Sequence, residues 1–411
     1  MSAGHGEAAA AAGPAVVLGL DPLWLATGIL IVAYAVLLSE KVNRTVVALL
    51  GAGAVILSGM LSQAQAFAGI DFNTIALLTG MMIIVAITRV SGVFEFVAIW
   101  AAKRVKAEPV GILLVLSLVT AVFSAFLDNL TTVLLVVPIA MLIVEKLDVS
   151  PNPFLFSQIL AANVGGTATL IGDPPNILIG SAAGLTFMQF LVELGPAVLV
   201  ILAVMVPVFK WLWGKDLVTT EKRRAGVMRF REAVSITDPA LLKKSLMVLA
   251  GVIAGFIVGE HFGIRPGTTA MFGAAVLLLV TMLGETEKEQ AERLHAALAE
   301  VEWSALFFFL GGGLMQLTGG DATWTAVATL WLSAVISAAV DNIPFVATMI
   351  PLAQSLQTEL GGPAGLEPVW WSLALGVCLG GNGSLIGAAA NVMVAGLGER
   401  AGHPISFAAY L

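Results

Sequence analysis

Two stretches of this sequence resemble each other and decide the fold. The first, from Ala121 to Pro138, reads AVFSAFLDNLTTVLLVVP, and the second, from Ala334 to Pro351, reads AVISAAVDNIPFVATMIP. Eight of their 18 positions are identical, including the central Asp-Asn pair and the closing proline. GGTATLIGDPPN (165–176) follows the first stretch, and GGNGSLIGAAAN (380–391) follows the second. Because two polar motifs recur in the same order at nearly the same spacing, the sequence predicts an internal repeat.

The chain around these motifs is strongly apolar. Of its 411 residues, 58% are hydrophobic and only 11% are charged, whereas a soluble domain carries roughly 25% charged residues. Several apolar runs approach or reach the roughly 20 residues that cross a bilayer as a helix. The composition therefore predicts an all-α polytopic membrane protein. The runs are Leu23–Leu38, Thr45–Leu61, Phe72–Ile87, Leu191–Trp213, Ser245–Val258 and Pro266–Leu283.

The basic residues predict the orientation of the repeats. Eighteen of the 20 Lys and Arg residues can be placed at helix ends on one side of a membrane, and the positive-inside rule makes that side cytoplasmic. The first repeat then starts outside and the second inside, so the two have inverted topology, as in many secondary transporters. The expected organisation is an N-terminal tail (1–22) without the basic start of a signal peptide, repeat 1 (23–213), a basic cytoplasmic linker (214–244) and repeat 2 (245–411).

Each Asp-Asn pair lies midway along an apolar stretch whose two ends are expected on the same side of the membrane. Pro109–Glu145 is flanked by basic residues, and Trp324–Ser355 is flanked by loops without Lys or Arg. We expect each stretch to form a re-entrant hairpin with Asp-Asn near its tip, although a pair of full spans is also compatible with the charges. The Gly- and Pro-rich motif that follows predicts a broken helix in each repeat.

Three acids lie within these motifs, Asp128, Asp173 and Asp341. An ionised Asp at membrane depth costs about 2.5–3.5 kcal/mol or more, so such acids indicate ion or substrate pathways. Broken helices offer free amides and carbonyls to ligands at the same depth. The candidate substrate and ion site therefore includes the acids and their polar or helix-breaking neighbours: Asn129, Thr131, Thr132, Gly165, Gly166, Thr167, Pro174, Asn176, Asn342, Pro344, Asn382, Gly383, Ser384 and Asn391.

Other roles compete for some of these positions. Gly165 serves close helix packing as readily as ligand binding. Asp173 has Ala388 as its counterpart, and capping of a half-helix that begins at Pro174 is favoured over a functional role. For Asp128 and Asp341 a proton- or cation-linked role is favoured over a folding role. Asp128 is expected to be the stronger of the two, because two threonines follow it.

The motifs FLDNLTTVLLVVP, NVGGTATLIGDPPNILIG and VDNIPFVATMIPL resemble those of the ion transporter superfamily, which has a citrate-transporter-like fold. The most similar group holds arsenite/antimonite efflux permeases, the melanosomal P protein and certain sodium/proton antiporters. The resemblance covers nearly the whole chain and implies two hairpins, two broken helices, a homodimer and elevator-type movement. It adds Asn163, Gly380 and Gly381 to the site.

The chain departs from this pattern in two ways. Asp71 to Asp128 spans 57 residues, whereas the matching Glu302 to Asp341 spans 39. About 18 residues are therefore missing after Gly313, and no counterpart of the final helix of repeat 1 follows repeat 2. We expect both segments to have been omitted from this sequence rather than lost by the transporter.

These features predict a secondary active transporter in the inner or plasma membrane of a bacterium or archaeon. The favoured activity is proton-coupled efflux of arsenite or antimonite, because Asn, Thr and Ser suit a small neutral trihydroxyl. A sodium/proton antiporter would bind sodium at the same residues. An organic-anion carrier is disfavoured, because DNL and DNI replace the Ser-Asn-Thr tips that the resemblance associates with dicarboxylate carriers. A channel is a further alternative.

An enzyme is not expected. The lone Cys378 excludes a multi-cysteine metal site within one chain, and no His lies at membrane depth to activate Ser384 as an intramembrane protease. No cofactor, resident metal or nucleic acid is expected. The expected partners are a small inorganic substrate, a coupling proton or sodium ion, membrane lipid and a second copy of the chain. At the basic linker, anionic lipid is favoured over a soluble ATPase.

Overall fold

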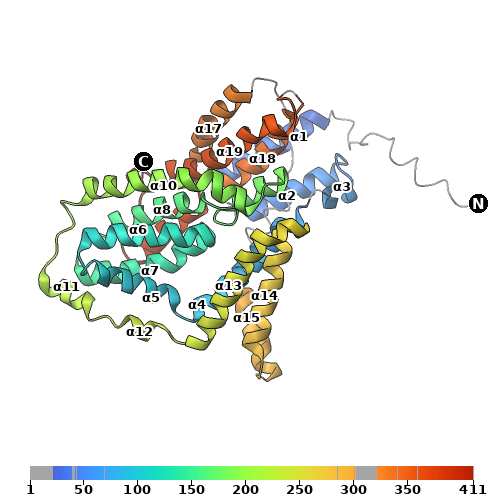
Figure 1. Cartoon of the computed structure of the whole chain (residues 1–411). Helices are drawn as coiled ribbons and strands as arrows, with labels where there is room; N and C mark the ends of the chain where they lie inside the picture. The colour runs from blue at the N-terminus through green and yellow to red at the C-terminus, as the bar shows by residue number, and fades with distance from the viewer. Residues whose placement is uncertain are drawn as a thin grey trace, which may run out of the picture. The chain divides into compact units, whose positions relative to one another are not determined.

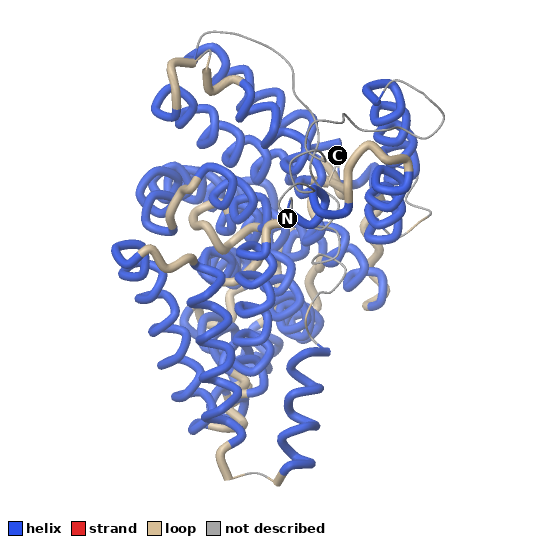
Figure 2. The backbone as a smooth tube through the Cα atoms, turned by 90° about the vertical axis from the view of Figure 1, so that its right-hand side faces the viewer, coloured by secondary structure: helices blue, strands red, loops and turns tan. Residues whose placement is uncertain are grey.

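The computed structural model describes residues 22–38, 42, 44–68, 70–284, 286–299, 301, 322–339, 341–358 and 360–410. These residues form helices joined by loops, and no strand occurs among them (Figure 2). The all-α prediction is therefore confirmed. Most of the N-terminal tail and the segment around Gly313, with its expected omission, lie outside the described residues.

The chain divides into two compact units, and the described part of the first ends at Ile75. It contains α1 (Pro22–Leu38), α2 (Arg44–Leu57), α3 (Gln63–Ala68) and the first turn of α4 (Phe72–Val90). Helices α1 and α2 pack against each other. Asp71 begins α4 by accepting a hydrogen bond from the Asn73 amide at 3.0 Å, because the first amides of a helix lack partners within it.

The second unit holds all the remaining described helices. Its first half is α5 (Val93–Arg104), α6 (Pro109–Phe126), α7 (Asn129–Leu147), α8 (Asn152–Gly166), α9 (Pro174–Ala183) and α10 (Phe187–Trp213). After α11 (Glu221–Met228) and α12 (Glu232–Ser235) come α13 (Pro239–Gly259), η3 (Glu260–Phe262), α14 (Pro266–Met282) and α15 (Glu287–Ala299). The chain ends with α17 (Ala322–Ala339), α18 (Asn342–Ser355), α19 (Pro363–Gly380), η4 (Gly381–Gly383), α20 (Ala389–Arg400) and α21 (Phe407–Tyr410).

Five helical segments among the described residues are long and apolar enough to cross a membrane: Phe72–Val90, Pro109–Phe126, Asn129–Leu147, Phe187–Trp213 and Pro239–Phe262. Helix α10 exposes large apolar side chains such as Leu199 (68%) and Val200 (65%). Such a surface is stable against lipid rather than water. Each of the six apolar runs of the sequence forms a helix over most of its length, and the chain is an integral membrane protein.

The two halves of the second unit share one local layout. A helix ends before an Asp, a second helix starts after it, and a broken helix follows. Helix α6 packs on α8 as α17 packs on α19. The Ser124 hydroxyl donates to the Ala162 carbonyl at 2.6 Å, and Ser337 donates to Val377 at 2.9 Å. The local repeat is therefore visible in matched contacts, while its inverted orientation and re-entrant course stay predictions.

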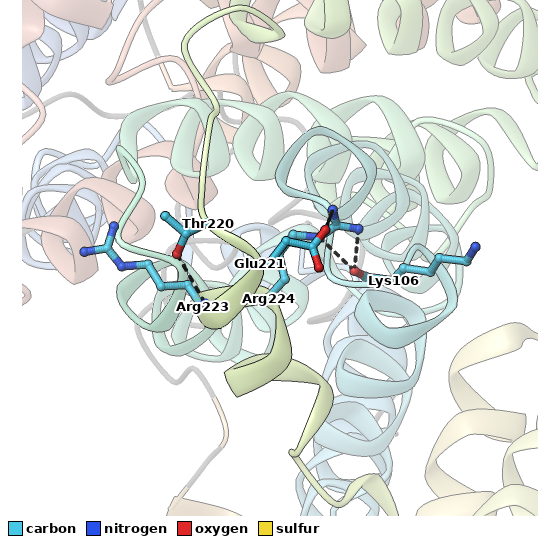
Figure 3. A network of polar contacts seen from close by, with 5 residues as sticks. All are labelled: Lys106, Thr220, Glu221, Arg223 and Arg224. Atoms are coloured by element: carbon cyan, nitrogen blue, oxygen red, sulfur yellow. Dashed lines mark hydrogen bonds and ion pairs between the residues drawn. The ribbon is translucent and has the colours of Figure 1, made fainter.

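The helices of the basic linker pack against helices of the first half (Figure 1). Helix α11 contacts α7, and α12 contacts α5. Figure 3 shows the Arg224 guanidinium directed at the Lys106 carbonyl, to which it donates two hydrogen bonds of 3.2 and 3.1 Å. Arg223 pairs with Asp148, and Lys103 pairs with Glu232 at 2.5 Å. The linker is thus bound to the same basic helix ends that the sequence placed on the cytoplasmic side.

Candidate functional site

Asp128 and Asp341 each cap the helix that follows them. The Asp128 carboxylate accepts hydrogen bonds from the Thr131 amide at 2.8 Å and from the Thr131 hydroxyl. Asp341 accepts from the Ile343 amide at 3.1 Å. Both acids are half-buried. Each therefore has the folding role that the sequence disfavoured, and their link to protons or cations stays a prediction.

Asn176 closes the first broken helix, in which α8 stops at Gly166 and α9 starts at Pro174. Its buried side-chain amide donates to the carbonyls of Gly166, Thr167 and Thr169 at 3.3, 3.2 and 2.9 Å. Unwound backbone inside a membrane is tolerated where such groups satisfy its carbonyls. Asn176 is therefore part of the framework of the break.

Asn391 closes the second break by the same contacts. Its side-chain amide donates to the carbonyls of Gly381 at 2.6 Å and Ser384 at 2.8 Å. These partners lie ten and seven residues before Asn391, as Gly166 and Thr169 lie before Asn176. One local rule therefore shapes both breaks.

The glycines at the ends of α8 and α19 allow close packing against α6 and α17. A Cβ on Gly165 would lie 2.2 Å from the Ala121 carbonyl oxygen, and one on Gly380 would lie 2.4 Å from that of Ala334. No Cβ fits at such distances, so only glycine lets the neighbouring helix come this close. Of the two roles left open for Gly165, the structure shows packing.

Asn163 joins the two halves of the unit. Its Oδ1 accepts from Asn129 at 3.1 Å, and its Nδ2 donates to Asn382 at 2.9 Å and to Asn391 at 2.8 Å. We call these four residues the amide cluster. Asn382 is half-buried and the other three are buried. The cluster presents donors and acceptors without net charge where the two breaks meet.

Cys378 has the place in the second half that Asn163 has in the first. Its buried thiol donates to Asn176 Oδ1 at 3.3 Å, which mirrors the bond from Asn163 to Asn391. Sequence reasoning did not assign Cys378 to the site. Extending the Gly-Gly alignment two residues upstream pairs ANVGG with VCLGG, which would have found it.

Asp173 does not cap α9, so the favoured prediction is wrong. It stands at the N-cap position, but within the described chain its side chain makes no capping hydrogen bond. Oδ1 instead accepts from Asn342 of α18 at 3.5 Å, and buried Oδ2 has no hydrogen-bond partner among the described residues. The reason is that Pro174 and Pro175 have no N–H to donate, and the Asn176 amide donates to the Asp173 backbone carbonyl at 3.0 Å.

The remaining candidate residues lie around these groups. Thr132 is buried, and its hydroxyl has no hydrogen-bond partner in the described structure. The Thr167 hydroxyl donates a hydrogen bond to the Asn163 carbonyl at 2.8 Å, and the Ser384 hydroxyl donates one to the Ala338 carbonyl. Pro344 is buried in the first turn of α18, and Gly383 is exposed. An apolar pocket borders Asp128, lined by Leu77, Leu78, Met81, Met82, Val85, Phe126, Leu127, Ile171 and Ile177.

The charged side chains around Asp173 are carboxyl groups. Among the described residues, the charged groups that act on Asp173 are Asp341 and Asp128. The hydrogen bonds described above for the amide cluster join amides to amides or to backbone carbonyls. The arrangement can therefore hold a neutral polar molecule, a cation or a proton, and offers an anion little.

Apolar spanning helices with two interrupted helices that meet at a buried polar cluster are typical of a membrane transporter. Residues 34–376 match the citrate transporter family, CitMHS, and the chain belongs to this family. An uncharacterized transporter of Mycobacterium tuberculosis is 42% identical over 405 residues, covering 93% of this chain and 92% of that protein.

Two further relatives are similarly informative. A 46 kDa membrane protein of Mycobacterium leprae is 39% identical over 405 residues, covering 93% of this chain and 92% of its own. The human P protein is 31% identical over 486 residues, covering 93% of this chain and 57% of its own. The resemblance to the superfamily is thereby confirmed, and the family and relatives named as transporters agree with a protein that is not an enzyme.

Proposed function

We propose that this chain is a secondary active transporter that exports a small neutral metalloid hydroxide, arsenite or antimonite, in exchange for protons. The observation that carries the proposal is the amide cluster, which presents side chains from both halves at the point where both helices break. A neutral trihydroxyl molecule both donates and accepts hydrogen bonds, and side-chain amides do the same. A site shared by both halves also suits alternating access, because relative movement of its two sides carries the substrate across.

The family's description points to citrate as another substrate. An organic anion needs positive charge in its site, or a bound cation that supplies it. The groups around Asp173 and the amide cluster are acids and amides instead. This environment favours a neutral substrate over a carboxylate.

Sodium/proton antiport is the second candidate, and the three acids support it. Asp128 and Asp341 both act electrostatically on Asp173, so a cation bound beside Asp173 would relieve this repulsion. In that case sodium is the cargo and the proton is its competitor. For a neutral metalloid, protonation of an acid would instead bias the transporter toward one of its two facing states.

Location and partners are part of the proposal. Mycobacterial relatives support a bacterial plasma membrane, and a homodimer follows from the resemblance to the superfamily. The linker has eight basic and four acidic residues, which suits anionic lipid better than a soluble ATPase. Neutralising Arg229 and Arg231 is expected to leave substrate affinity unchanged in either case.

Inverted membrane vesicles test the proposed substrate directly. With the vesicle lumen acidified by respiration, arsenite should accumulate inside, and a protonophore should abolish the accumulation. Sodium and citrate are measured side by side, with vesicles from cells that lack the protein as the background. Asn163→Leu breaks the amide cluster and should abolish arsenite uptake. Saturable transport of citrate without arsenite would overturn the assignment, and sodium transport alone would favour antiport.

A further inference from the structure

At the position of Asp173, the two halves have different side chains but the same backbone conformation. Its counterpart is Ala388, which precedes the half-helix α20 as Asp173 precedes α9. The backbone angles are φ −144°, ψ 132° at Asp173 and φ −149°, ψ 148° at Ala388. Because alanine supports the same turn in the second half, the fold does not require a carboxyl group here.

The Asp173 carboxyl group is enclosed and weakly bonded. The residue is 0% exposed, Oδ1 accepts from Asn342 at 3.5 Å, and Oδ2 lacks a partner within the described structure. The Cys378 thiol also lies against this carboxyl group. That thiol has one proton, however, and directs it to Asn176 Oδ1 at 3.3 Å.

The surroundings of Asp173 supply no counter-charge in the described part of the chain. The titratable groups that face it are Cys378 on α19, Asp341 at the start of α18 and Asp128 at the start of α7. An ionised carboxylate enclosed with acids and without a cation is strongly disfavoured. Such a group is stable when it holds a proton or lies beside a bound cation.

The other two acids are better partnered. Asp128 receives an amide and a hydroxyl hydrogen bond from Thr131, and Asp341 receives one from the Ile343 amide. Both are half-buried helix caps, whose oxygens accept hydrogen bonds from the first turn of the helix that follows. Asp173 alone among the three combines complete burial with an unpartnered oxygen in the described structure.

We infer that Asp173 is the proton-carrying residue of this transporter and that Asn342 and Cys378 of the second half position its carboxyl group. The inference rests on the proposed proton-coupled transport and names the residue responsible. A proton from water binds Oδ2 when the site opens to one side and leaves when it opens to the other, and no other bond changes. Protonation adds an O–H donor to a side chain that otherwise only accepts, which alters its bonding to the second half.

Infrared difference spectroscopy of the purified protein tests the inference without any substrate. Titration of the wild type with acid and base should show the carbonyl band of a buried protonated carboxylic acid. The band should be absent in Asp173→Asn and present in Asp128→Asn, in Asp341→Asn and in the surface control Asp148→Asn. In Cys378→Ser its titration midpoint should move. A band that persists in Asp173→Asn, or one that disappears in Asp128→Asn or Asp341→Asn, overturns the inference.

Transport separates this inference from the proposed function. In proteoliposomes, Asp173→Asn should lose pH-gradient-driven accumulation of arsenite by on the order of tenfold or more, a typical coupling between two binding events. Asp173→Glu should restore the gradient response. If Asp173→Asn accumulates arsenite like the wild type, the inference is wrong. If the wild type does not move arsenite, the proposed substrate is wrong, and the infrared result still decides which residue carries the proton.

Discussion

At the scale of single residues, the repeat provides its own controls. Asn176 and Asn391 make the same contacts in the two breaks, which identifies a shared structural role. Asp173 and Ala388 share a backbone conformation and differ in chemistry. Among the three acids, the one that its counterpart lacks is therefore the better candidate for the proton-carrying role than the two that recur.

Gly165→Ala should destabilise the protein because the new methyl group meets the α6 backbone. The added Cβ would lie 2.2 Å from the Ala121 carbonyl oxygen, so α8 and α6 must separate. Overpacking of this kind costs about 1–3 kcal/mol. Thermal unfolding in detergent should show a lower Tm, whereas the matched control Gly251→Ala, in α13 with nothing within 4 Å, should be neutral or slightly stabilising. Equal Tm values for the two variants would refute the packing role.

Asn176→Ala should loosen the first broken helix. It removes the donor to three backbone carbonyls, and each buried carbonyl left unsatisfied costs about 1–3 kcal/mol. Hydrogen exchange measured by mass spectrometry should rise across residues 166–176. The exposed Asn152→Ala at the start of α8 serves as the control. An unchanged exchange pattern in Asn176→Ala would show that water satisfies these carbonyls.

At the scale of elements, the helices and their breaks follow from the sequence. Apolar runs and Gly- or Pro-rich interruptions are local patterns, so the six predicted runs and both breaks occur where expected. The bonds that Asn163 makes to Asn382 and Asn391 join residues 219 and 228 positions apart. Such pairings depend on how distant elements pack, so the sequence indicated the candidates without their partners. Cys378, in contrast, was within reach of the sequence, because the repeat alignment pairs ANVGG with VCLGG. The cap at Asp173 fails for a local reason, since Pro174 and Pro175 have no N–H.

The linker should be held more tightly at neutral pH than in acid. Its Glu232 receives a hydrogen bond from Lys103, which holds the pKa of that carboxyl group below its ordinary value of 4.5. Since the folded pKa is lowered, the contact stabilises the linker fully above about pH 4.5 and is lost as the pH falls through the folded value. Hydrogen exchange of residues 229–236, corrected for the intrinsic rate, should be faster in Glu232→Gln at neutral pH. The difference from the wild type should vanish in acid, and the exposed Glu287→Gln should show none. A difference that is the same at every pH would exclude this contact as its cause.

At the scale of the whole molecule, alternating access depends on the orientation of the two repeats in the membrane. The bonds from the linker to Lys103, Lys106 and Asp148 collect the basic helix ends of the second unit at one place. The positive-inside rule predicts that this place is cytoplasmic. The predicted division at residues 214–244 and the opposite orientation of the two repeats follow from this side assignment and from the sequence.

Single-cysteine labelling with a membrane-impermeant reagent should confirm this topology in a Cys378→Ala background. Lys103→Cys and Arg224→Cys should react from the cytoplasmic side, and Gln63→Cys and Glu359→Cys from the outside. Because inverted repeats start on opposite sides, labels at positions 63 and 224 must be separated by the membrane. Reaction of both from one side would exclude inverted topology.

Counterflow of labelled arsenite into proteoliposomes tests the central claim most directly. Vesicles loaded with unlabelled arsenite and diluted into a trace of label should transiently accumulate the label above equilibrium, because a carrier exchanges substrate at a saturable site. Asn163→Leu should abolish this overshoot, while the surface variant Asn152→Ala should retain it. Uptake that only rises to equilibrium without saturation would indicate a channel. The same overshoot in Asn163→Leu would contradict a substrate site at the amide cluster.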